Sequence, residues 1–209
     1  MTAFSLEEAF SKLRGRRVRR TQELPPLSPW QPTQDELAFG PRTNSADGIY
    51  IATLSEKIPT ERIELAWKAT LASERQQHRG PDFLPGPHYD SAVAVQNGRI
   101  AGAALAKLEC RALYVWNVSL KENGTAYKHE ELTKENGLTF NGKLGDRPTV
   151  FTIWVHTAHR RKGIGRQLVA ALAEHFSLAV NEIGFRLPLS KDAVHMLEAM
   201  GLKSVIGCF

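Results

Sequence analysis

The residues best suited to chemistry lie in one short loop, residues 160–166, which reads RRKGIGR. Glycine permits a tight turn and a close approach of the backbone to a ligand, so Gly163 and Gly165 can leave several N–H groups facing one concavity. An apolar run typical of a buried strand precedes the loop, and an amphipathic helical pattern follows it. The N-terminus of a helix attracts negative charge, and the four basic side chains of the loop add to that attraction. The loop therefore predicts a site for a phosphate or a pyrophosphate.

Two familiar phosphate-binding motifs do not fit this loop. The P-loop requires Gly-Lys-Ser/Thr at a fixed spacing, and the loop has none. The dinucleotide fingerprint G-x-G-x-x-G lacks one glycine here, and no βαβ unit surrounds it. A basic loop with two glycines can also be an ordinary turn, so the elements around it decide between a turn and a ligand site.

Those elements alternate between strands and helices. Asn97-Gly98 stands between two apolar runs, which is the strongest short-range signal for a β-hairpin, and residues 109–119 are expected to prolong its second strand. A helix is expected to begin at Pro59. Further strands are expected at 49–52, 150–155, 183–187 and 204–209, and further helices at 164–176 and 191–200. This order predicts an α/β fold on a mixed sheet.

The chain divides into two predicted parts. Residues 1–47 combine a basic helix, which starts at a capping box from Ser5 to Glu8, with a proline-rich segment expected to pack on the domain in extended form through Trp30. Residues 48–209 form the predicted α/β domain, with a polar insertion at 120–148.

The motif R-x-x-G-x-G after a strand that ends in Val155 resembles the GNAT superfamily of coenzyme A-dependent N-acyltransferases, and the order of elements over residues 48–209 fits it. The resemblance implies a mostly antiparallel mixed sheet, flanked by helices and splayed at the strand before the loop. It implies acetyl-CoA as the acyl donor and an amine as the acceptor. It also implies that the backbone of Trp154 and Val155 holds the pantetheine arm, and that an N–H near Val155 polarises the thioester carbonyl. The coenzyme pyrophosphate is then expected on Arg161, Lys162, Gly163, Ile164, Gly165 and Arg166, and Arg160 is expected to bind the coenzyme as well.

Within the superfamily, several stretches resemble the acetyltransferases that establish sister-chromatid cohesion. The resemblance rests on IWV at 153–155 followed by RRK at 160–162, and on Glu182-Ile183 with Phe185 and Pro188 downstream. It implies acetyl transfer to a lysine of a chromatin-associated protein.

The chain also departs from that family. Residues 1–47 hold no cysteine, so the family's zinc finger is not expected there. Ala170 and Leu187 stand where the family has acidic residues, and Leu197 replaces the tyrosine that many GNAT enzymes use as leaving-group acid. The scaffold therefore carries over more safely than the catalytic groups, and a coenzyme A-binding protein with little activity is an alternative.

Amide formation requires a neutral amine, whereas a lysine ammonium has an unperturbed pKa near 10.4. The candidate bases are Glu174, Glu182, His156 and His195. Each has a simpler alternative role, since the two carboxylates can be ordinary surface residues and the two histidines can end a strand or pack on a helix. A direct attack, in which the amine loses its proton to water or to a distant carboxylate, stays open.

Charge and cysteine content narrow the function further. The net charge of +5 is local, because Lys12 to Arg20 hold six basic residues and the loop at 160–166 holds four. The other 17 basic residues face 22 acidic ones, so the rest of the chain carries −5 and suits a basic acceptor. A protein lysine is the first expectation and a small-molecule amine the second. A nucleic-acid-associated role for Lys12 to Arg20 is the third.

Two distant cysteines, Cys110 and Cys208, predict neither a disulfide framework nor a metal site. An intracellular location is expected, in the cytoplasm or, in a eukaryote, the nucleus. The sequence holds no apolar stretch long enough to predict a membrane span.

Overall fold

The computed structural model describes residues 30–53, 59–77, 83, 89–109, 115–120, 147–186 and 189–208. The predicted basic helix after Ser5, the segment from Lys12 to Arg20 and all but the ends of the predicted insertion at 120–148 lie outside these residues.

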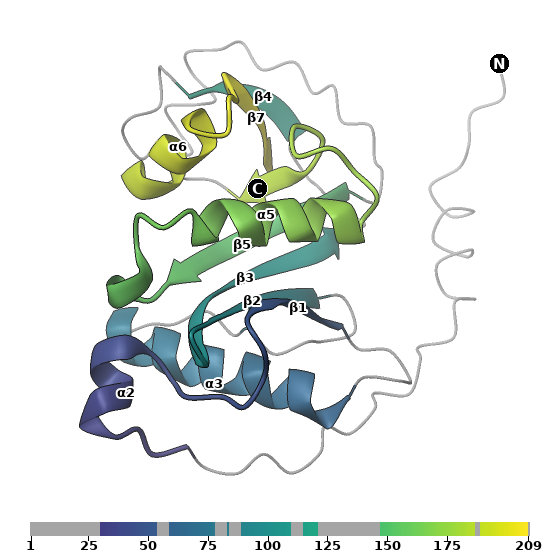
Figure 1. Ribbon diagram of the computed structural model, residues 1–209. Coiled ribbons are helices and arrows are strands. Elements are labelled where there is room, and N and C mark those ends of the chain that lie inside the picture. Colours follow the sequence, from purple (N-terminus) through teal and green to yellow (C-terminus); the bar gives the residue numbers. More distant parts are fainter. Residues whose placement is uncertain are drawn as a thin grey trace, which may run out of the picture.

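In the described residues, seven strands form one mixed sheet in the order β1-β2-β3-β5-β6-β7-β4 (Figure 1). The strands are β1 (Gly48–Thr53), β2 (Tyr89–Gln96), β3 (Arg99–Glu109), β4 (Val115–Ser119), β5 (Arg147–Val155), β6 (Gly184–Arg186) and β7 (Ser204–Cys208). Neighbours are antiparallel except at β5–β6 and β6–β7, which are parallel. The expected mixed and mostly antiparallel sheet is confirmed.

The predicted hairpin is β2 and β3, joined at Asn97 and Gly98 with φ angles of 54° and 64°. Positive φ at both turn residues matches the right-handed twist of the strands, which is why Asn-Gly favours this turn. The expectation that residues 109–119 prolong β3 is wrong, because residues 115–119 form a separate strand against β7. Both edges of β3 are already paired, with β2 and with β5. The residue pattern predicts that a segment is a strand, but it does not predict which strand it pairs with.

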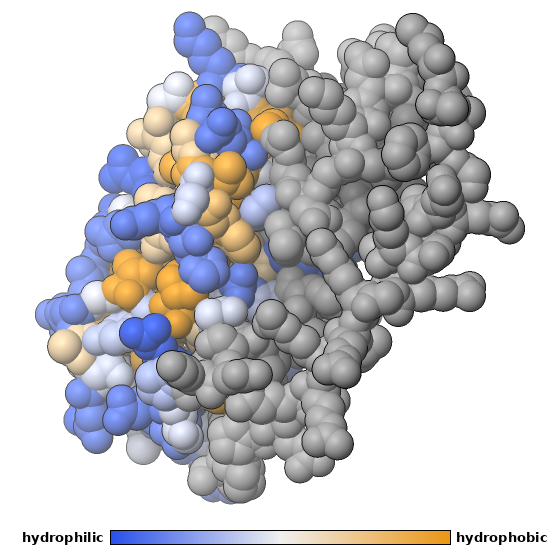
Figure 2. All heavy atoms as spheres, turned by 90° about the vertical axis from the view of Figure 1, so that its right-hand side faces the viewer, coloured by the Kyte–Doolittle hydropathy of each residue, from blue (hydrophilic) through white to orange (hydrophobic). Residues whose placement is uncertain are grey.

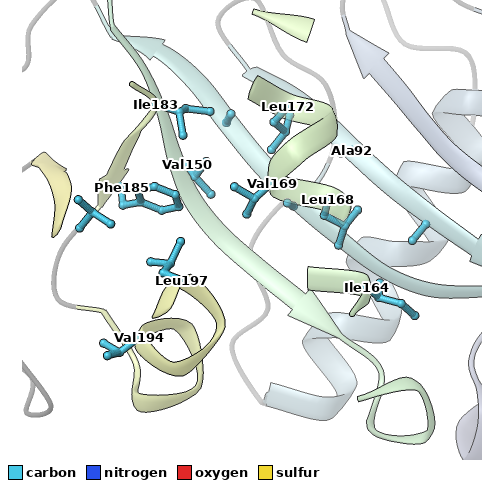
Figure 3. Close-up of a cluster of buried hydrophobic side chains, with 14 of the residues drawn as sticks. Ala92, Val150, Ile164, Leu168, Val169, Leu172, Ile183, Phe185, Val194 and Leu197 are labelled. Carbon is cyan, nitrogen blue, oxygen red and sulfur yellow. The ribbon is translucent and has the colours of Figure 1, made fainter. Parts of the chain in front are cut away.

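Helices cover both faces of the sheet. Helix α3 (Thr60–Gln77) packs on β1, β2 and β3, while α5 (Ile164–His175) and α6 (Lys191–Glu198) lie on the opposite face. Figure 3 shows the core under α5 and α6, where Leu168, Val169 and Leu172 of α5 point to the strands and Leu197 of α6 points to Phe185. These side chains are almost fully buried, so this core fixes where α5 begins and where the loop before it lies.

The sequence predicted that the proline-rich segment packs on the domain in extended form. This expectation is wrong for part of the segment. Residues Gln34–Phe39 form a short helix, α2, with a capping box in which Glu36 N–H donates to Thr33 Oγ1 at 3.2 Å and Thr33 N–H donates to Glu36 Oε2 at 3.1 Å. Trp30 packs against the core under α3, and its Nε1 donates to Glu36 Oε1 at 3.4 Å. These contacts join the segment to the domain that follows it.

None of the described helices is both long enough and apolar enough to span a membrane. Figure 2 shows the face at the right of Figure 1, where the described side chains are hydrophilic around the edge and hydrophobic in a central group.

Candidate active site

The site is built on a fork between β5 and β6. In the described residues these strands pair only at Thr149 with Gly184 and at Val150 with Phe185. Strand β5 continues beyond the fork, and its far end still pairs with β3, Val155 opposite Gly102. The edge of β5 that faces β6 is therefore free of a strand partner after Val150, within the part of the chain described. This is the splay that the resemblance implied, and it leaves backbone groups open to an extended ligand.

A β-bulge lies at the fork. Consecutive residues Leu105 and Ala106 of β3 pair with Thr152 and Val150 of β5, so Phe151 is an extra residue in β5. A bulge bends its strand and redirects its side chains. Below the bulge, Ile153 and Val155 face α5 and α6, whereas Trp154 faces α3.

A pocket of about 450 Å³ opens on the α5–α6 side of the fork. That volume is within the range of small-molecule sites, about 300–1,000 Å³. Strand β5, the loop after it, the first turn of α5 and one face of α6 line the pocket. The lining residues are Ile153, Val155, His159, Arg160, Arg161, Gly163, Ile164, Gly165, Arg166, Ser190, Asp192, Ala193, His195, Met196 and Ala199.

The N-terminus of α5 faces this pocket without a side-chain cap. Gly163 is the N-cap residue, with φ +80° in the left-handed region, and no side chain caps this end of the helix with a hydrogen bond. The first intrahelical bond runs from Gln167 N–H to Gly163 O at 3.1 Å, so the N–H groups of the first turn have no partner inside the helix. A Cβ at Gly163 would lie 3.2 Å from Arg166 Nη2, so glycine leaves space beside this guanidinium at the helix N-terminus. The cradle fits the pyrophosphate of coenzyme A.

A second glycine sets the distance between α5 and α6. A Cβ at Gly165 would lie 2.7 Å from the sulfur of Met196, closer than side chains approach. Glycine at this position lets the first turn of α5 pack against Met196 of α6 at the pocket wall, and a Cβ would require the flexible Met196 side chain to move.

Two buried histidines lie in the turn between β5 and the coenzyme loop and connect it to α2. His156 accepts from Ala158 N–H through Nδ1 at 3.2 Å, so its proton is on Nε2, which donates to Leu37 O at 3.2 Å. Burial lowers the pKa of His156 below its ordinary value, which favours this neutral ring. His159 contacts the same short helix, with its Nε2 2.9 Å from Phe39 O, and its ring also lines the pocket. Helix α2 thus holds the turn that leads from β5 into the coenzyme loop.

The pocket brings together most of the predicted coenzyme residues. Val155 and the loop residues line it, but Lys162 is exposed outside the lining, and the ring of Trp154 is buried on the α3 side, where Nε1 donates to Gln76 Oε1 at 3.1 Å. The backbone of Trp154 is part of the strand edge described above, as the resemblance implied.

The four candidate bases are separated by the fold. His156 is buried outside the pocket lining, and both of its ring nitrogens are hydrogen-bonded. His195 is an exposed residue of α6 that lines the pocket. Glu174 is exposed on the last turn of α5, and Glu182 is exposed in the turn before β6, where its Oε2 accepts from Ala179 N–H at 2.8 Å. Both carboxylates stand outside the lining of this pocket, so general-base roles for them stay predictions.

Sequence reasoning missed several lining residues, above all Ile153, His159 and Asp192. Ile153 belongs to the apolar run that predicted the strand, so that run was the signal for it. Ser190 is the N-cap of α6 and accepts from Ala193 N–H, and this capping pattern was the signal that Asp192 lies in the first turn of the helix. The role of His159 depends on α2, which the sequence did not lead us to expect.

The sequence model of the acetyltransferase (GNAT) family matches residues 60–202. The chain belongs to this family. It is an acetyltransferase that takes the acetyl group from acetyl-CoA and transfers it to an amine. Among the described residues, no group of three His, Cys, Asp or Glu side chains is arranged to hold a metal ion.

Solved structures are similar to the chain in fold. The xEco2 acetyltransferase domain bound to a K105-CoA conjugate has 17% identity and a TM-score of 0.51, over 80% of this chain and 96% of that one. The same domain without the conjugate has 18% identity and a TM-score of 0.50, over 80% and 94%. A ribosomal-protein-alanine N-acetyltransferase from Brucella melitensis biovar Abortus 2308 has 19% identity and a TM-score of 0.41, over 74% and 90%. No curated protein sequence matches the chain.

Proposed function

We propose that this GNAT acetyltransferase transfers the acetyl group to the side-chain amine of a lysine in a protein. The observation that carries the proposal is the fold shared with the xEco2 domain, which was captured with a K105-CoA conjugate and is covered over 96% of its length. The resemblance of 153–155 and 160–162 to the cohesion acetyltransferases points the same way. A protein of the cohesion machinery is the finer form of this proposal.

The fork explains how the residues of this chain serve the transfer. The cradle at Gly163 and its basic neighbours hold the pyrophosphate, and the free edge of β5 holds the pantetheine arm in extended form. A backbone N–H of β5 near Val155 donates to the thioester oxygen and stabilises the negative charge that develops there. The amine nitrogen bonds to the carbonyl carbon, the C–S bond breaks, and coenzyme A leaves as the thiolate.

The amine must also give up a proton. Of the four candidate bases, we favour His195, because it is exposed and lines the pocket. An imidazole changes its charge near neutral pH and can accept a proton from an amine through one water molecule. Glu174 or Glu182 acting through solvent is the alternative.

The test is a search for products by mass spectrometry. The full chain is incubated with acetyl-CoA and either a protein lysate or a panel of polyamines and aminoglycosides, with a reaction lacking enzyme as the control. We expect acetyl groups on protein lysines that increase with time. Products confined to small amines, or no product although calorimetry shows acetyl-CoA binding, would reject the proposal.

A further inference from the structure

Arg160 joins the two halves of the coenzyme site. Its Nε donates a hydrogen bond to Val155 O at 3.3 Å, and both residues line the pocket. Val155 is the last residue of β5, and Arg160 follows the short 3₁₀ helix Thr157–His159, so the turn brings this side chain back to the end of the strand. The bond therefore lies between the strand edge expected to hold the pantetheine arm and the cradle for the pyrophosphate.

The carbonyl group of Val155 lies on the free edge of β5. Opposite residues of an antiparallel pair alternate between those that exchange hydrogen bonds and those that do not. His156 N–H donates to Ala101 O at 2.9 Å, so this pair exchanges hydrogen bonds. The next pair, Val155 and Gly102, therefore exchanges none. The N–H and O of Val155 point away from β3, and Arg160 binds a backbone group that this edge would otherwise offer to an extended ligand.

The side chain of Arg160 is free to leave this position, whereas its backbone is held by the turn. Arg160 N–H donates to Thr157 O at 3.3 Å, and Ala158 N–H donates to His156 Nδ1 at 3.2 Å. The side chain is exposed, and no ion pair among the described residues includes it. A single bond to a neutral carbonyl is thus what holds the guanidinium at the strand edge.

A phosphate group competes with Val155 O for the same guanidinium. Hydrogen bonds between arginine and phosphate are charge-assisted and often bidentate, and they are roughly twice as strong as bonds between neutral groups. The pantetheine arm carries no charge, so it offers the guanidinium no comparable partner. A ligand shifts an equilibrium only as far as it binds one state better than the other. The pyrophosphate is therefore the part of the donor that favours release of Val155 O.

We propose that Arg160 alternates between Val155 O and the pyrophosphate of the donor, and that it thereby selects the acyl donor. A donor with a pyrophosphate draws the side chain away and opens the strand edge to its own pantetheine arm. A thioester without a phosphate, such as acetyl-pantetheine, must displace Arg160 unaided and binds more weakly. The inference concerns the donor, so it holds for any amine acceptor.

Binding of the two halves of the coenzyme tests this without an acceptor. Pantetheine carries the arm without the pyrophosphate, and ADP carries a pyrophosphate without the arm. We expect Arg160→Ala to bind pantetheine roughly threefold more tightly than the wild type, because no side chain then covers Val155 O. The same variant should bind ADP roughly fivefold more weakly, because a charge-assisted bond is lost. Titrations of the full chain followed by NMR measure both dissociation constants.

Arg160→Gln separates the two roles of the side chain. Glutamine Nε2 is as many bonds from Cα as arginine Nε, the atom that donates to Val155 O, but glutamine has no charge. We expect this variant to bind pantetheine as the wild type does and to bind ADP as weakly as Arg160→Ala.

Arg161→Ala is the matched control. It removes the same charge from the neighbouring lining residue, and within the part of the chain described no hydrogen bond joins Arg161 to β5. This variant should weaken ADP binding and leave pantetheine binding unchanged. The proposal would be overturned by pantetheine binding that is unchanged, weaker or undetectable in Arg160→Ala, or by an equal gain in Arg161→Ala.

Discussion

Gly163 has a left-handed backbone at the point where the coenzyme loop becomes α5. A residue with a Cβ pays about 1–2 kcal/mol for that conformation, and the Cβ would fill the space beside Arg166. We expect Gly163→Ala to lower the free energy of unfolding by about that amount and to weaken acetyl-CoA binding by roughly tenfold. Calorimetry and urea denaturation measure the two effects separately.

Gly201 provides the matched control for this substitution. Its φ is +83°, close to that of Gly163, but a Cβ there would contact nothing within 4 Å, and Gly201 lies outside the pocket lining. Gly201→Ala should therefore cost similar stability and leave acetyl-CoA binding unchanged. Equal weakening of binding by both variants would mean that Gly163 acts through stability and not as part of the cradle.

The residues of the site differ in how far the sequence reveals them. The coenzyme loop is contiguous, so its glycines and basic residues predict a phosphate site without any knowledge of the fold. His159 reaches the pocket from the short 3₁₀ helix Thr157–His159, and His195 reaches it from α6. Only the packing of these two elements brings the two side chains together. A lone histidine in a sequence carries no sign of what surrounds it.

Among the elements, α2 is the one that joins the N-terminal segment to the turn before the coenzyme loop. It precedes the residues that the family model matches, and the carbonyl groups of Leu37 and Phe39 contact His156 and His159 below the coenzyme loop. Arg99 also contacts it, with Nη2 2.6 Å from Asp35 Oδ2, and this interaction lowers the pKa of Asp35. The helix therefore orients a loop to which it is not adjacent in sequence.

Gly40 allows us to test that role. It ends α2 with φ +95°, and a Cβ there would lie 2.5 Å from Ile100 O, so Gly40→Ala must displace the helix from β3. We expect faster hydrogen exchange at the amides of Leu37 and Gly40 and a several-fold higher KM for acetyl-CoA, with kcat little changed. Mass spectrometry and steady-state kinetics measure these effects.

Gly98→Ala is the comparison, because Gly98 also has positive φ, +64°, but its nearest contact, Thr43 O, would be 3.7 Å from a Cβ. That variant should strain the hairpin and leave the KM for acetyl-CoA unchanged. An unchanged KM in Gly40→Ala, despite faster exchange in α2, would show that the helix does not support the coenzyme loop.

Elements with a strong periodic pattern could be predicted from the sequence. The hairpin at Asn97-Gly98 and the helix after Gly163 lie where their patterns place them. Helix α2 was not predicted, because the prolines around it favoured an extended segment. The capping box from Thr33 to Glu36 is the sequence pattern that indicates this helix. The pairing of β4 with β7 and the bulge at Phe151 depend on long-range register, which short patterns do not contain.

At the scale of the whole molecule, net charge and local charge point in different directions. Outside its two basic clusters the chain carries −5, which predicts a basic acceptor.

Stability as a whole should depend on pH through His156. Burial is the largest cause of its lowered pKa; the charges of His159, Arg160 and Arg99 add to the effect, and the hydrogen bond to Leu37 O opposes it. The folded protein therefore binds this proton less readily than the unfolded chain. Above about pH 6.5 the ring is neutral in both states and contributes no pH dependence. As the pH falls below about 6.5, the unfolded chain takes up the proton first, and the free energy of unfolding decreases by at most about 1.4 kcal/mol per pH unit until the folded pKa is reached.

His156→Gln isolates this contribution, because glutamine keeps an N–H donor for Leu37 O and does not titrate. At about pH 7.5 the variant should be less stable than the wild type, since glutamine does not reproduce the bond from Ala158 N–H equally well. As the pH falls below about 6.5, the wild type loses the stability that depends on the neutral ring, and the difference between the two proteins narrows. Urea denaturation at a series of pH values measures both curves. Parallel curves over this range would show that the proton of His156 does not limit the acid stability of the fold, and that the turn below the coenzyme loop tolerates a charged ring.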